Sequence, residues 1–430
     1  MEGNARSGSA TWWSRVSKGI VRPLTCAAAA IGMLLAVGGC GSTADAKVMY
    51  FWNGLIGDDG PAMQKIINDY NATDPEYKIV FQPMQDKDLM TKIYSVAQTG
   101  DNIPDLVIAN QFKTAVMHSQ GILNTIEDWQ KVAPELNEKN YLPQAWNNVM
   151  FDGKAYGIPL YMYQMAIYYN KSLVEQYHLE HIIEDGFVTI DEVKSLKGVL
   201  PKDIYGMAYG NLPWAFMSLL YGAGGTLETS MDDATSDAWR KPMQALRETV
   251  ESGVVAPLSV DSMQAFGSGH AVFAQLGTWG QGNMAETLGK DNIAEVNTLQ
   301  YSTDNFSNFL YQNNWMQIKD PKRPPERSRA AAKFIKYVYE HWMDWAYVGS
   351  ISPAYRDLNN PEYQKLIQAS FTNSQEERDV IRTSNYLYGG YAVTAWNLYN
   401  DIVYGNLTLD DGLKALDKTI KGQIEIQDQT

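Results

Sequence analysis

The chain has 430 residues, a formal charge of −14 and a hydrophobic content of 45%. An acidic excess of this size argues against nucleic acid and anionic lipid surfaces as partners, because both attract basic patches. The length is sufficient for two domains, each with its own core.

The first 39 residues have the composition of a bacterial export signal. A basic stretch at residues 6–22 precedes an apolar run at residues 24–37, which is shorter than the ~20 residues of a membrane-spanning helix. Residues 35–40 (LAVGGC) place small residues directly before a cysteine and resemble a lipobox. We therefore expect cleavage before Cys40 and a lipid on that residue, the alternative being an ordinary buried thiol. This predicts a protein anchored on the extracytoplasmic face of the cell membrane.

Cleavage at this point changes the charge and the thiol content of the mature chain. Residues 1–39 carry four basic residues and one acidic residue, so the chain from Cys40 onward has a formal charge of about −17. The other cysteine, Cys26, lies inside the signal, so we expect neither an internal disulfide nor a cysteine-rich metal site. Residues 40–47 then form the lipid anchor and a short, flexible linker.

Short apolar strands alternate with amphipathic helices from residue 48 onward. Residues 48–52 predict a buried strand, Asn53 and Gly54 a turn, and residues 58–70 a helix that begins with two aspartates, a glycine and a proline. Strands are predicted at 77–81 and 105–109, and helices at 86–98 and from Gln111 to Gly121. This alternation predicts βαβ crossovers, a mostly parallel sheet and ligand-binding loops at the carboxyl ends of its strands.

The second half of the chain adds long aromatic stretches. Residues 153–171 contain two apolar runs around Pro159 and predict a crossing between lobes, and residues 305–318 predict a second extended run. Further predictions are a helix at 214–220, a strand at 271–276, one helix at 328–347, and closing helices at 391–403 and 409–420. Trp342 and Trp345 fall on the buried face of the helix at 328–347.

Seven of these stretches occur in an order that resembles one known family, the extracellular solute-binding proteins of family 1, which are the maltose-binding-like sugar-binding proteins of ABC importers. The matching stretches are FWNGLIGDDGPAMQKIINDYNATDPEYKI, PDLVIANQF, DGKAYGIPLYMYQMAIYYNKSL, SLLYGAGGTL, AFGSGHAVFAQLGTW, AAAKFIKYVYEHW and YAVTAWNLYNDIVYGNLTLDDGLKAL. Together they extend over nearly the whole chain that follows the linker.

The resemblance implies a two-lobed α/β fold of the periplasmic-binding-protein type, with a ligand cleft between lobes joined by crossing hinge segments. Lobe one would comprise residues 48–159 and 315–349, and lobe two residues 160–314 and 350–430. The implied function is that of a substrate-binding lipoprotein, which captures a carbohydrate, an oligosaccharide in particular, and delivers it to membrane permease subunits. It implies a monomer that binds no cofactor and catalyses no reaction.

A sugar presents hydroxyl groups and apolar ring faces, so its site needs aromatic platforms and planar polar side chains. Ten of the 12 tryptophans follow Cys40. The resemblance points to Trp214, Trp279 and Trp396 as stacking platforms, although tryptophans at these positions also suit a core.

The remaining candidates are polar or aromatic residues at strand ends, in the crossings and in one late loop. Each has a structural alternative, such as a helix cap, a turn or the core. They are Asn53, Asp86, Asn110, Gln111, Tyr161, Tyr163, Trp315, Tyr355 and Arg356.

Three other classes of function have weaker support. An exported glycosidase needs two carboxylates that flank the scissile bond, but the pairs at 58–59, 232–233 and 410–411 are adjacent residues that point apart. Residues 280–285 match a loose G-x-G-x-x-A dinucleotide pattern late in the chain. His178 and His181 lack further ligands for a metal nearby in the sequence.

Overall fold

The computed structural model describes residues 47–57 and 59–429. The export signal, both cysteines, residues 41–46 and Asp58 lie outside the described residues, and the predictions made for them remain predictions. Within the described part of the chain, no helix combines the length and the apolar character that a membrane crossing requires.

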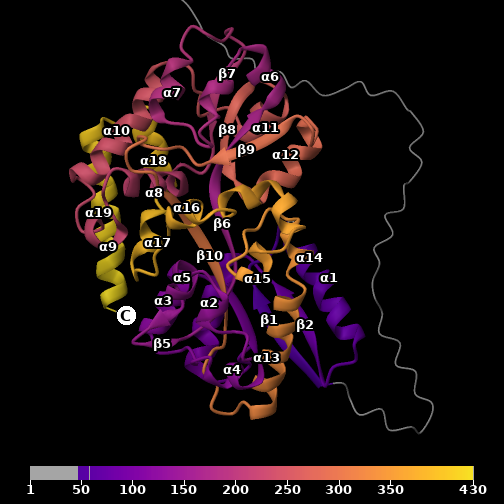
Figure 1. Cartoon of the computed structure of the whole chain (residues 1–430). Helices are drawn as coiled ribbons and strands as arrows, with labels where there is room; N and C mark the ends of the chain where they lie inside the picture. The colour runs from indigo at the N-terminus through magenta and orange to yellow at the C-terminus, as the bar shows by residue number, and fades with distance from the viewer. Residues whose placement is uncertain (1–46, 58, 430) are drawn as a thin grey trace, which may run out of the picture. The chain divides into compact units, whose positions relative to one another are not determined.

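One mixed sheet organises the molecule, with the strand order β2-β1-β3-β10-β6-β8-β7, while β9 pairs with β6 and β11 with β10. Its strands are β1 Lys47–Asn53, β2 Tyr77–Pro83, β3 Leu106–Asn110, β6 Ile158–Asn170, β7 Tyr205–Tyr209, β8 Ala271–Gly277, β9 Ile293–Asn297, β10 Asn308–Met316 and β11 Ile381–Arg382. Figure 1 shows β1 and β2 in one lobe, β7 to β9 in the other, and β6 and β10 running between them. We call these the first and the second lobe.

Helices cover the strands of each lobe (Figure 1). The first lobe contains α1 Asp59–Ala72, α2 Asp86–Thr99, α3 Gln111–Ser119, α4 Glu127–Val132, η1 Glu138–Asn140, α5 Pro143–Asn147, α13 Pro325–Glu340, α14 Met343–Ala346 and a hairpin of β4 Met150–Phe151 and β5 Lys154–Ala155. The second lobe contains α6 Lys171–Gln176, η2 Glu180–Ile182, α7 Ile190–Ser195, α8 Leu212–Gly222, α9 Leu227–Ser230, α10 Asp237–Glu251, α11 Ser262–Gly267, η3 Thr278–Gly280, α12 Gln281–Leu288, α18 Trp396–Val403 and α19 Leu409–Asp428.

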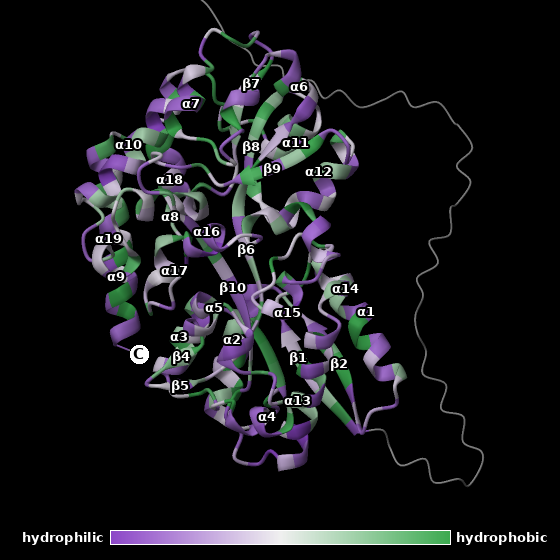
Figure 2. Ribbon diagram, in the orientation of Figure 1, coloured by the Kyte–Doolittle hydropathy of each residue, from purple (hydrophilic) through white to green (hydrophobic). Residues whose placement is uncertain are grey.

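Short elements occupy the segment between α14 and α18. They are α15 Tyr355–Leu358, η4 Tyr363–Lys365, η5 Ile367–Phe371, α16 Gln375–Asp379 and α17 Gly389–Ala392. Figure 2 shows hydrophobic residues along the strands of both lobes and hydrophilic residues over much of the outer helices, which is the pattern of a sheet buried under amphipathic helices.

The expectation of a mostly parallel sheet is wrong. β1 pairs parallel with β2 and β3, and β7 pairs parallel with β8. In contrast, β10 is antiparallel to β3 and β6, and β6 is antiparallel to β8 and β9. The antiparallel pairs arise because the two crossing strands lie side by side and extend the sheet of each lobe.

Two helices that the sequence predicts as continuous are interrupted. The helix predicted at 328–347 ends at Glu340 in α13 and resumes at Met343 in α14. Both tryptophans near the break donate an indole hydrogen bond to a residue outside the two helices. Trp342 Nε1 donates to the Leu160 carbonyl (2.7 Å), and Trp345 Nε1 donates to Ser350 Oγ (2.9 Å). Both tryptophans are buried, as predicted.

The helix predicted at 391–403 is also two helices, α17 and α18. Ala395 has φ −86° and ψ 48°, which is outside the helical range. The hydroxyl of Tyr399 donates to the Ala392 carbonyl (2.8 Å), and so satisfies an acceptor that the interruption frees.

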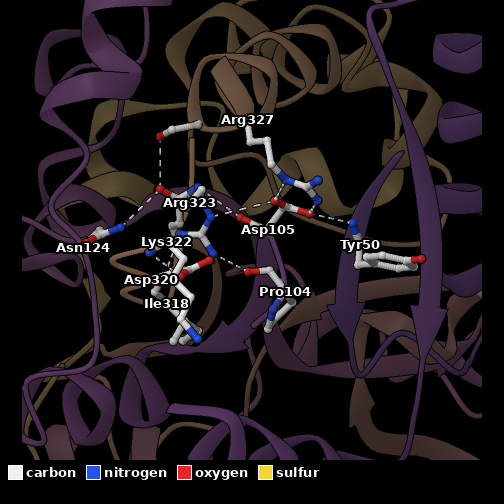
Figure 3. Close-up of polar contacts among 11 residues, drawn as sticks. Tyr50, Pro104, Asp105, Asn124, Ile318, Asp320, Lys322, Arg323 and Arg327 are labelled. Carbon is white, nitrogen blue, oxygen red and sulfur yellow. Dashed lines mark hydrogen bonds and ion pairs between the residues drawn. The ribbon is translucent and has the colours of Figure 1, made fainter. Parts of the chain in front are cut away.

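A buried ion cluster fastens the loop between β10 and α13 to the start of β3 (Figure 3). Asp105, 2% exposed, accepts from Arg327 Nε (2.8 Å) and Nη2 (2.5 Å) and from the Tyr50 backbone N–H (2.9 Å). Arg323, whose side chain is 4% exposed, donates to the carbonyls of Ile318 (2.8 Å) and Pro104 (2.7 Å). Because Asp105 neutralises two cations in a buried place, its charge is required for the stability of this loop.

We expect Asp105→Asn to lower the free energy of unfolding by about 3–5 kcal/mol, because it removes the buried carboxylate that pairs with the buried Arg323 side chain and the partly exposed Arg327 side chain. Denaturant titration measures this loss. Asp101→Asn is the matched control, because its ion pair with Lys322 is exposed (74% and 70%) and should change stability by less than about 1 kcal/mol. Equal losses in the two variants would contradict the assigned role.

A second buried carboxyl group, that of Glu295, has no counter-charge among the described residues. Glu295 lies on β9 opposite Tyr168 of β6, is 7% exposed, and has no hydrogen-bond partner for either carboxylate oxygen within the described chain. Burial raises the pKa of Glu295 to about 8, and Tyr168, whose hydroxyl donates to the Gly277 carbonyl (3.4 Å), opposes only part of that shift. The folded protein therefore holds a proton that the unfolded chain releases near its ordinary pKa of 4.5.

Because the folded-state pKa is the higher one, Glu295 lowers the stability of the fold progressively as the pH rises from about 4.5 to about 8. We expect Glu295→Gln to remove this part of the pH dependence. The stability of the variant relative to wild type should therefore increase by about a few kcal/mol from pH 5 to pH 8. Denaturation at both pH values tests this, with exposed Glu286→Gln as control. Parallel pH profiles for wild type and Glu295→Gln would refute it.

Candidate functional site

A cavity of about 370 Å³ lies where the first-lobe loops face the crossing strands and the second lobe. It is lined by backbone and small side chains from the ends of β1 and β3, by two carboxylates, and by four aromatic rings. The lining residues are Gly54, Leu55, Gly57, Asp59, Asp86, Ile108, Ala109, Asn110, Tyr161, Tyr163, Trp214, Trp279, Asn313, Val348, Gly349 and Ser350.

The first-lobe wall consists of loops that follow parallel strands. Asn53 ends β1, and its Oδ1 accepts from the Leu55 N–H (3.0 Å), which turns the chain toward α1. Asn53 is fully buried and is not part of the lining, so the structure gives it the turn role that the sequence left open. Leu55, Gly57 and Asp59 line the cavity instead.

Asn110 combines a capping role with a place at the cavity. Its Oδ1 accepts from the Lys113 N–H (3.0 Å) as the N-cap of α3. Among the described residues, the side-chain amide of Asn110 makes no other hydrogen bond. Its NH₂ group is therefore available to an acceptor in the cavity.

An ion pair adds charge to the same wall. Lys113 Nζ donates to the carboxylate of Asp86, the first residue of α2. The Lys113 side chain is 23% exposed and that of Asp86 is 66% exposed, so the carboxylate keeps access to solvent and to a ligand. Charged groups of this kind make strong hydrogen bonds with hydroxyl groups.

The opposite wall is a cluster of aromatic rings. Tyr163 of β6 stacks on Trp214 of α8 (ring centroids 5.5 Å apart, 19°), and Trp279 of η3 meets both edge-on, at 5.0 Å from Tyr163 and 5.7 Å from Trp214. Tyr311 of β10, 1% exposed, stacks behind them at 4.4 Å from Trp214 and 5.6 Å from Tyr163. Tyr311 thus supports Trp214 and Tyr163, two of the rings that line the cavity.

Trp279 is placed by a glycine. A Cβ atom on Gly277 would lie 2.1 Å from the Trp279 ring atoms Cη2 and Cζ3, so the indole packs directly on the backbone there. Trp279 remains 41% exposed. Trp396 is 39% exposed and its ring centroid lies 6.5 Å from that of Trp214, but it is not part of the lining.

The two tyrosines from β6 carry neutral hydroxyl groups. Burial raises the pKa of Tyr163 far above its ordinary value, and the nearby carboxylates of Asp86 and Asp59 raise it further. Burial also raises the pKa of Tyr161, together with Asp59, Tyr163 and Asp86, while a hydrogen bond with Asn313 opposes the shift. At neutral pH both hydroxyls therefore remain protonated.

Besides Asn53 and Trp396, four more expected site residues lie outside the cavity lining. Gln111 is fully buried and its Oε1 accepts from the Gln312 N–H (2.9 Å). Trp315, 1% exposed, packs in the first-lobe core at 4.9 Å from Phe51. Arg356 donates to the carbonyls of Tyr339 and Glu340 (2.6 Å each), and so caps the last turn of α13. Tyr355, beside it on α15, packs on the same core.

Some lining residues escaped the sequence analysis. Asp59 was interpreted as part of a solvated carboxylate pair, and Asn313 lies within an aromatic run that was assigned to a crossing. Asn313 pairs with both Asn110 and Tyr161. The available sequence signal was the run of three amide residues, Gln312 to Asn314, within an otherwise aromatic and apolar stretch. The sequence around Val348, Gly349 and Ser350 gives no signal except the glycine itself, which has φ +79° in the structure.

Two α/β lobes joined by crossing strands, with a mixed polar and aromatic cavity at their junction, define a protein that binds a small ligand between lobes. The family of bacterial extracellular solute-binding proteins matches residues 65–366, and the chain belongs to this family. The family resemblance and the two-lobed fold that the sequence implied are both confirmed.

The chain is similar to maltodextrin-binding protein MdxE of Bacillus subtilis, with 26% identity over 249 residues, which cover 55% of this chain and 56% of that protein. The chain thus spans about half the length of this relative. The sugar-binding protein MalE of Xanthomonas citri has a similar structure, with a TM-score of 0.73, 14% identity, and coverage of 89% of this chain and 100% of that one. The GacH receptor of Streptomyces glaucescens has a TM-score of 0.72, 17% identity, and coverage of 87% and 99%.

Proposed function

We propose that this protein captures a carbohydrate in the cavity between its lobes and delivers it to the permease subunits of an ABC importer. The observation that carries the proposal is the pairing of two different walls: the rings of Tyr163, Trp214 and Trp279 on one side, and the polar groups of Asn110 and Asp86 on the other. This pairing suits a ring that has apolar faces and hydroxyl edges. The maltodextrin named for the relative MdxE and the acarbose named for the GacH receptor are ligands of that chemistry.

Each wall has a separate task in the proposed complex. An indole face covers the C–H surface of a sugar ring with little loss of side-chain entropy. The Asp86 carboxylate accepts from hydroxyl groups, and the Asn110 amide NH₂ donates to them, so that no sugar hydroxyl is buried without a partner. The ligand is bound and released unchanged, because the site's task is recognition and not catalysis.

We also propose how the lobes divide the chain. The boundaries implied by the family resemblance put residues 48–159 and 315–349 in the first lobe and the remainder in the second. The contacts of one segment favour a shift of the last boundary: the Leu142 N–H donates to the Pro353 carbonyl (2.8 Å), and Arg356 binds the end of α13. We therefore assign residues 350–358 to the first lobe.

We further propose that Cys40 carries a lipid that tethers the protein to the outer face of the cytoplasmic membrane, because an apolar run and small residues converge on this cysteine. Cys40→Ala should release the protein into the medium or leave it unprocessed. Fractionation and mass spectrometry of the mature N-terminus measure this. A wild-type protein without lipid, together with unchanged membrane retention of Cys40→Ala, would exclude the anchor.

Loss of an aromatic platform should weaken carbohydrate binding. We expect Trp214→Ala and Trp279→Ala to lower the affinity for the best-binding maltooligosaccharide by roughly ten- to hundredfold, or on the order of 1–3 kcal/mol. Gly277→Ala should act similarly, because its methyl group displaces the Trp279 indole without removing it. Calorimetry on variants with wild-type melting behaviour is the measurement.

The matched control is Gly280→Ala, whose new methyl group meets the flexible ends of Met284, at 3.3 Å, and Met263, at 3.9 Å. It should bind like wild type. Wild-type affinity in both tryptophan variants would mean that these rings serve the core and that the ligand binds elsewhere. Hydrolysis of the oligosaccharide by the purified protein would favour an exported glycosidase instead.

A further inference from the structure

One aromatic side chain of the first lobe is inserted into the core of the second. Phe112 lies in the first turn of α3 and is 4% exposed. It belongs to the same buried cluster as Leu227, Tyr311 and Ala392. In the described part of the chain, Phe112 is the one residue before β6 that belongs to this cluster. The ring therefore joins the two lobes at a point outside the crossing strands.

The seat of the Phe112 ring is built from two glycines of α17. A Cβ atom on Gly389 would lie 2.4 Å from Phe112 Cε1, and one on Gly390 would lie 3.3 Å from Phe112 Cβ. Neither glycine has a positive φ, so the backbone conformation does not require glycine there. Glycine weakens a helix, and the close approach of Phe112, by its ring to Gly389 and by its Cβ atom to Gly390, is the physical reason for having two in α17.

The ring is connected to both walls of the cavity, although it lines neither. Its edge faces Tyr311 (centroids 6.2 Å apart, 75°), the ring that supports Trp214 and Tyr163. Its neighbour in the chain, Lys113, pairs with Asp86. Separation of the lobes would therefore withdraw Phe112 from its seat and part the two walls in the same movement.

We propose that Phe112, seated on Gly389 and Gly390, is an interlobe latch that favours the closed form and thereby sets ligand affinity and residence time. This inference rests on the proposed function, in which the ligand contacts both walls. A ligand that needs both walls binds the closed form, so its apparent affinity falls in proportion to the fraction of closed molecules. The latch contributes to that fraction without touching the ligand.

The test compares Phe112→Ala with Phe266→Ala in the full-length chain. Phe266 is the matched control: it is fully buried in α11, which packs against β7, β8 and α12 of the same lobe. Both variants lose a buried phenyl ring, but only the ring of Phe112 packs against residues of the other lobe. Stopped-flow kinetics and calorimetry with the best-binding maltooligosaccharide, and small-angle scattering with and without it, are the measurements.

We expect Phe112→Ala to dissociate from the ligand about tenfold faster, with little change in association rate, and to have a larger radius of gyration than wild type without ligand. Phe266→Ala should match wild type in both respects. Affinity and dimensions of Phe112→Ala equal to those of Phe266→Ala would overturn the latch.

A double-mutant cycle keeps the test independent of any general loss of stability. Gly389→Ala alone should loosen closure, because its methyl group occupies the place of the Phe112 ring. In the Phe112→Ala background the same methyl group no longer meets the ring, and its remaining close contact is the flexible end of Leu227 (3.2 Å), so its further effect should be clearly smaller. Additive effects of the two substitutions would overturn the direct contact.

The scattering measurement also separates this inference from the proposed function. If the wild-type protein binds no carbohydrate, the proposed function fails, but the ligand-free dimensions of the wild type and the variants still report on the latch. Equal ligand-free dimensions in all of them would overturn the latch even if the wild-type protein binds carbohydrate tightly.

Discussion

The pairing of β6 with β10 is the constraint on which the site depends. Tyr163 pairs with Tyr311, and Asn313 pairs with Tyr161 on one side and with Asn110 of β3 on the other. The register of this pairing therefore fixes the positions of Tyr311, Asn313 and Asn110 relative to one another. A slip by one residue would turn these side chains to the opposite face of the sheet, so the site could not tolerate a variable register.

Alternate residues of β10 serve opposite faces of the sheet, as the period of a strand requires. Tyr311 and Asn313 face the cavity side, whereas Gln312 and Asn314 take part in a buried amide network. Gln312 Nε2 donates to the Ala145 carbonyl (2.9 Å) and to Asn314 Oδ1 (2.6 Å), and Asn314 Nδ2 donates to Thr114 Oγ1 (3.1 Å). This network fastens α5 and α3 to the crossing strand, so that the polar wall and the aromatic wall share one rigid support.

Close approach to a glycine holds two aromatic rings in place. Gly277 receives the Trp279 indole and Gly389 receives the Phe112 ring. In both cases the absence of a Cβ atom, and not a positive φ, is what the structure uses. Rings held in this way are ordered before the ligand arrives, which reduces the entropy lost on binding. The site is thus organised by packing around it as well as by the residues that line it.

The sequence by itself determined the alternation of strands and helices from β1 to α3, the two crossings, and several residues that the structure places at the cavity, among them Asp86, Asn110, Tyr163, Trp214 and Trp279. Periodicity and turn chemistry are local properties, and the family resemblance extends over most of the chain, so these features could be predicted. Local signals also led to the prediction of one continuous helix at 328–347 and one at 391–403. The helical periodicity of the sequence continues through both interruptions, whereas hydrogen bonds to other parts of the chain break the helices there.

Only the tertiary structure decided which candidates line the cavity and which serve the fold. Asn53 and Asn110 both end a strand and both accept from a backbone N–H, yet only Asn110 lines the cavity. Trp315 and Trp279 are both aromatic residues near a crossing, but one packs in the core and the other stays 41% exposed. The physical reason is that the same type of side chain can cap a helix, pack in a core or face a ligand cavity equally well. The choice among them is made by partners distant in the sequence.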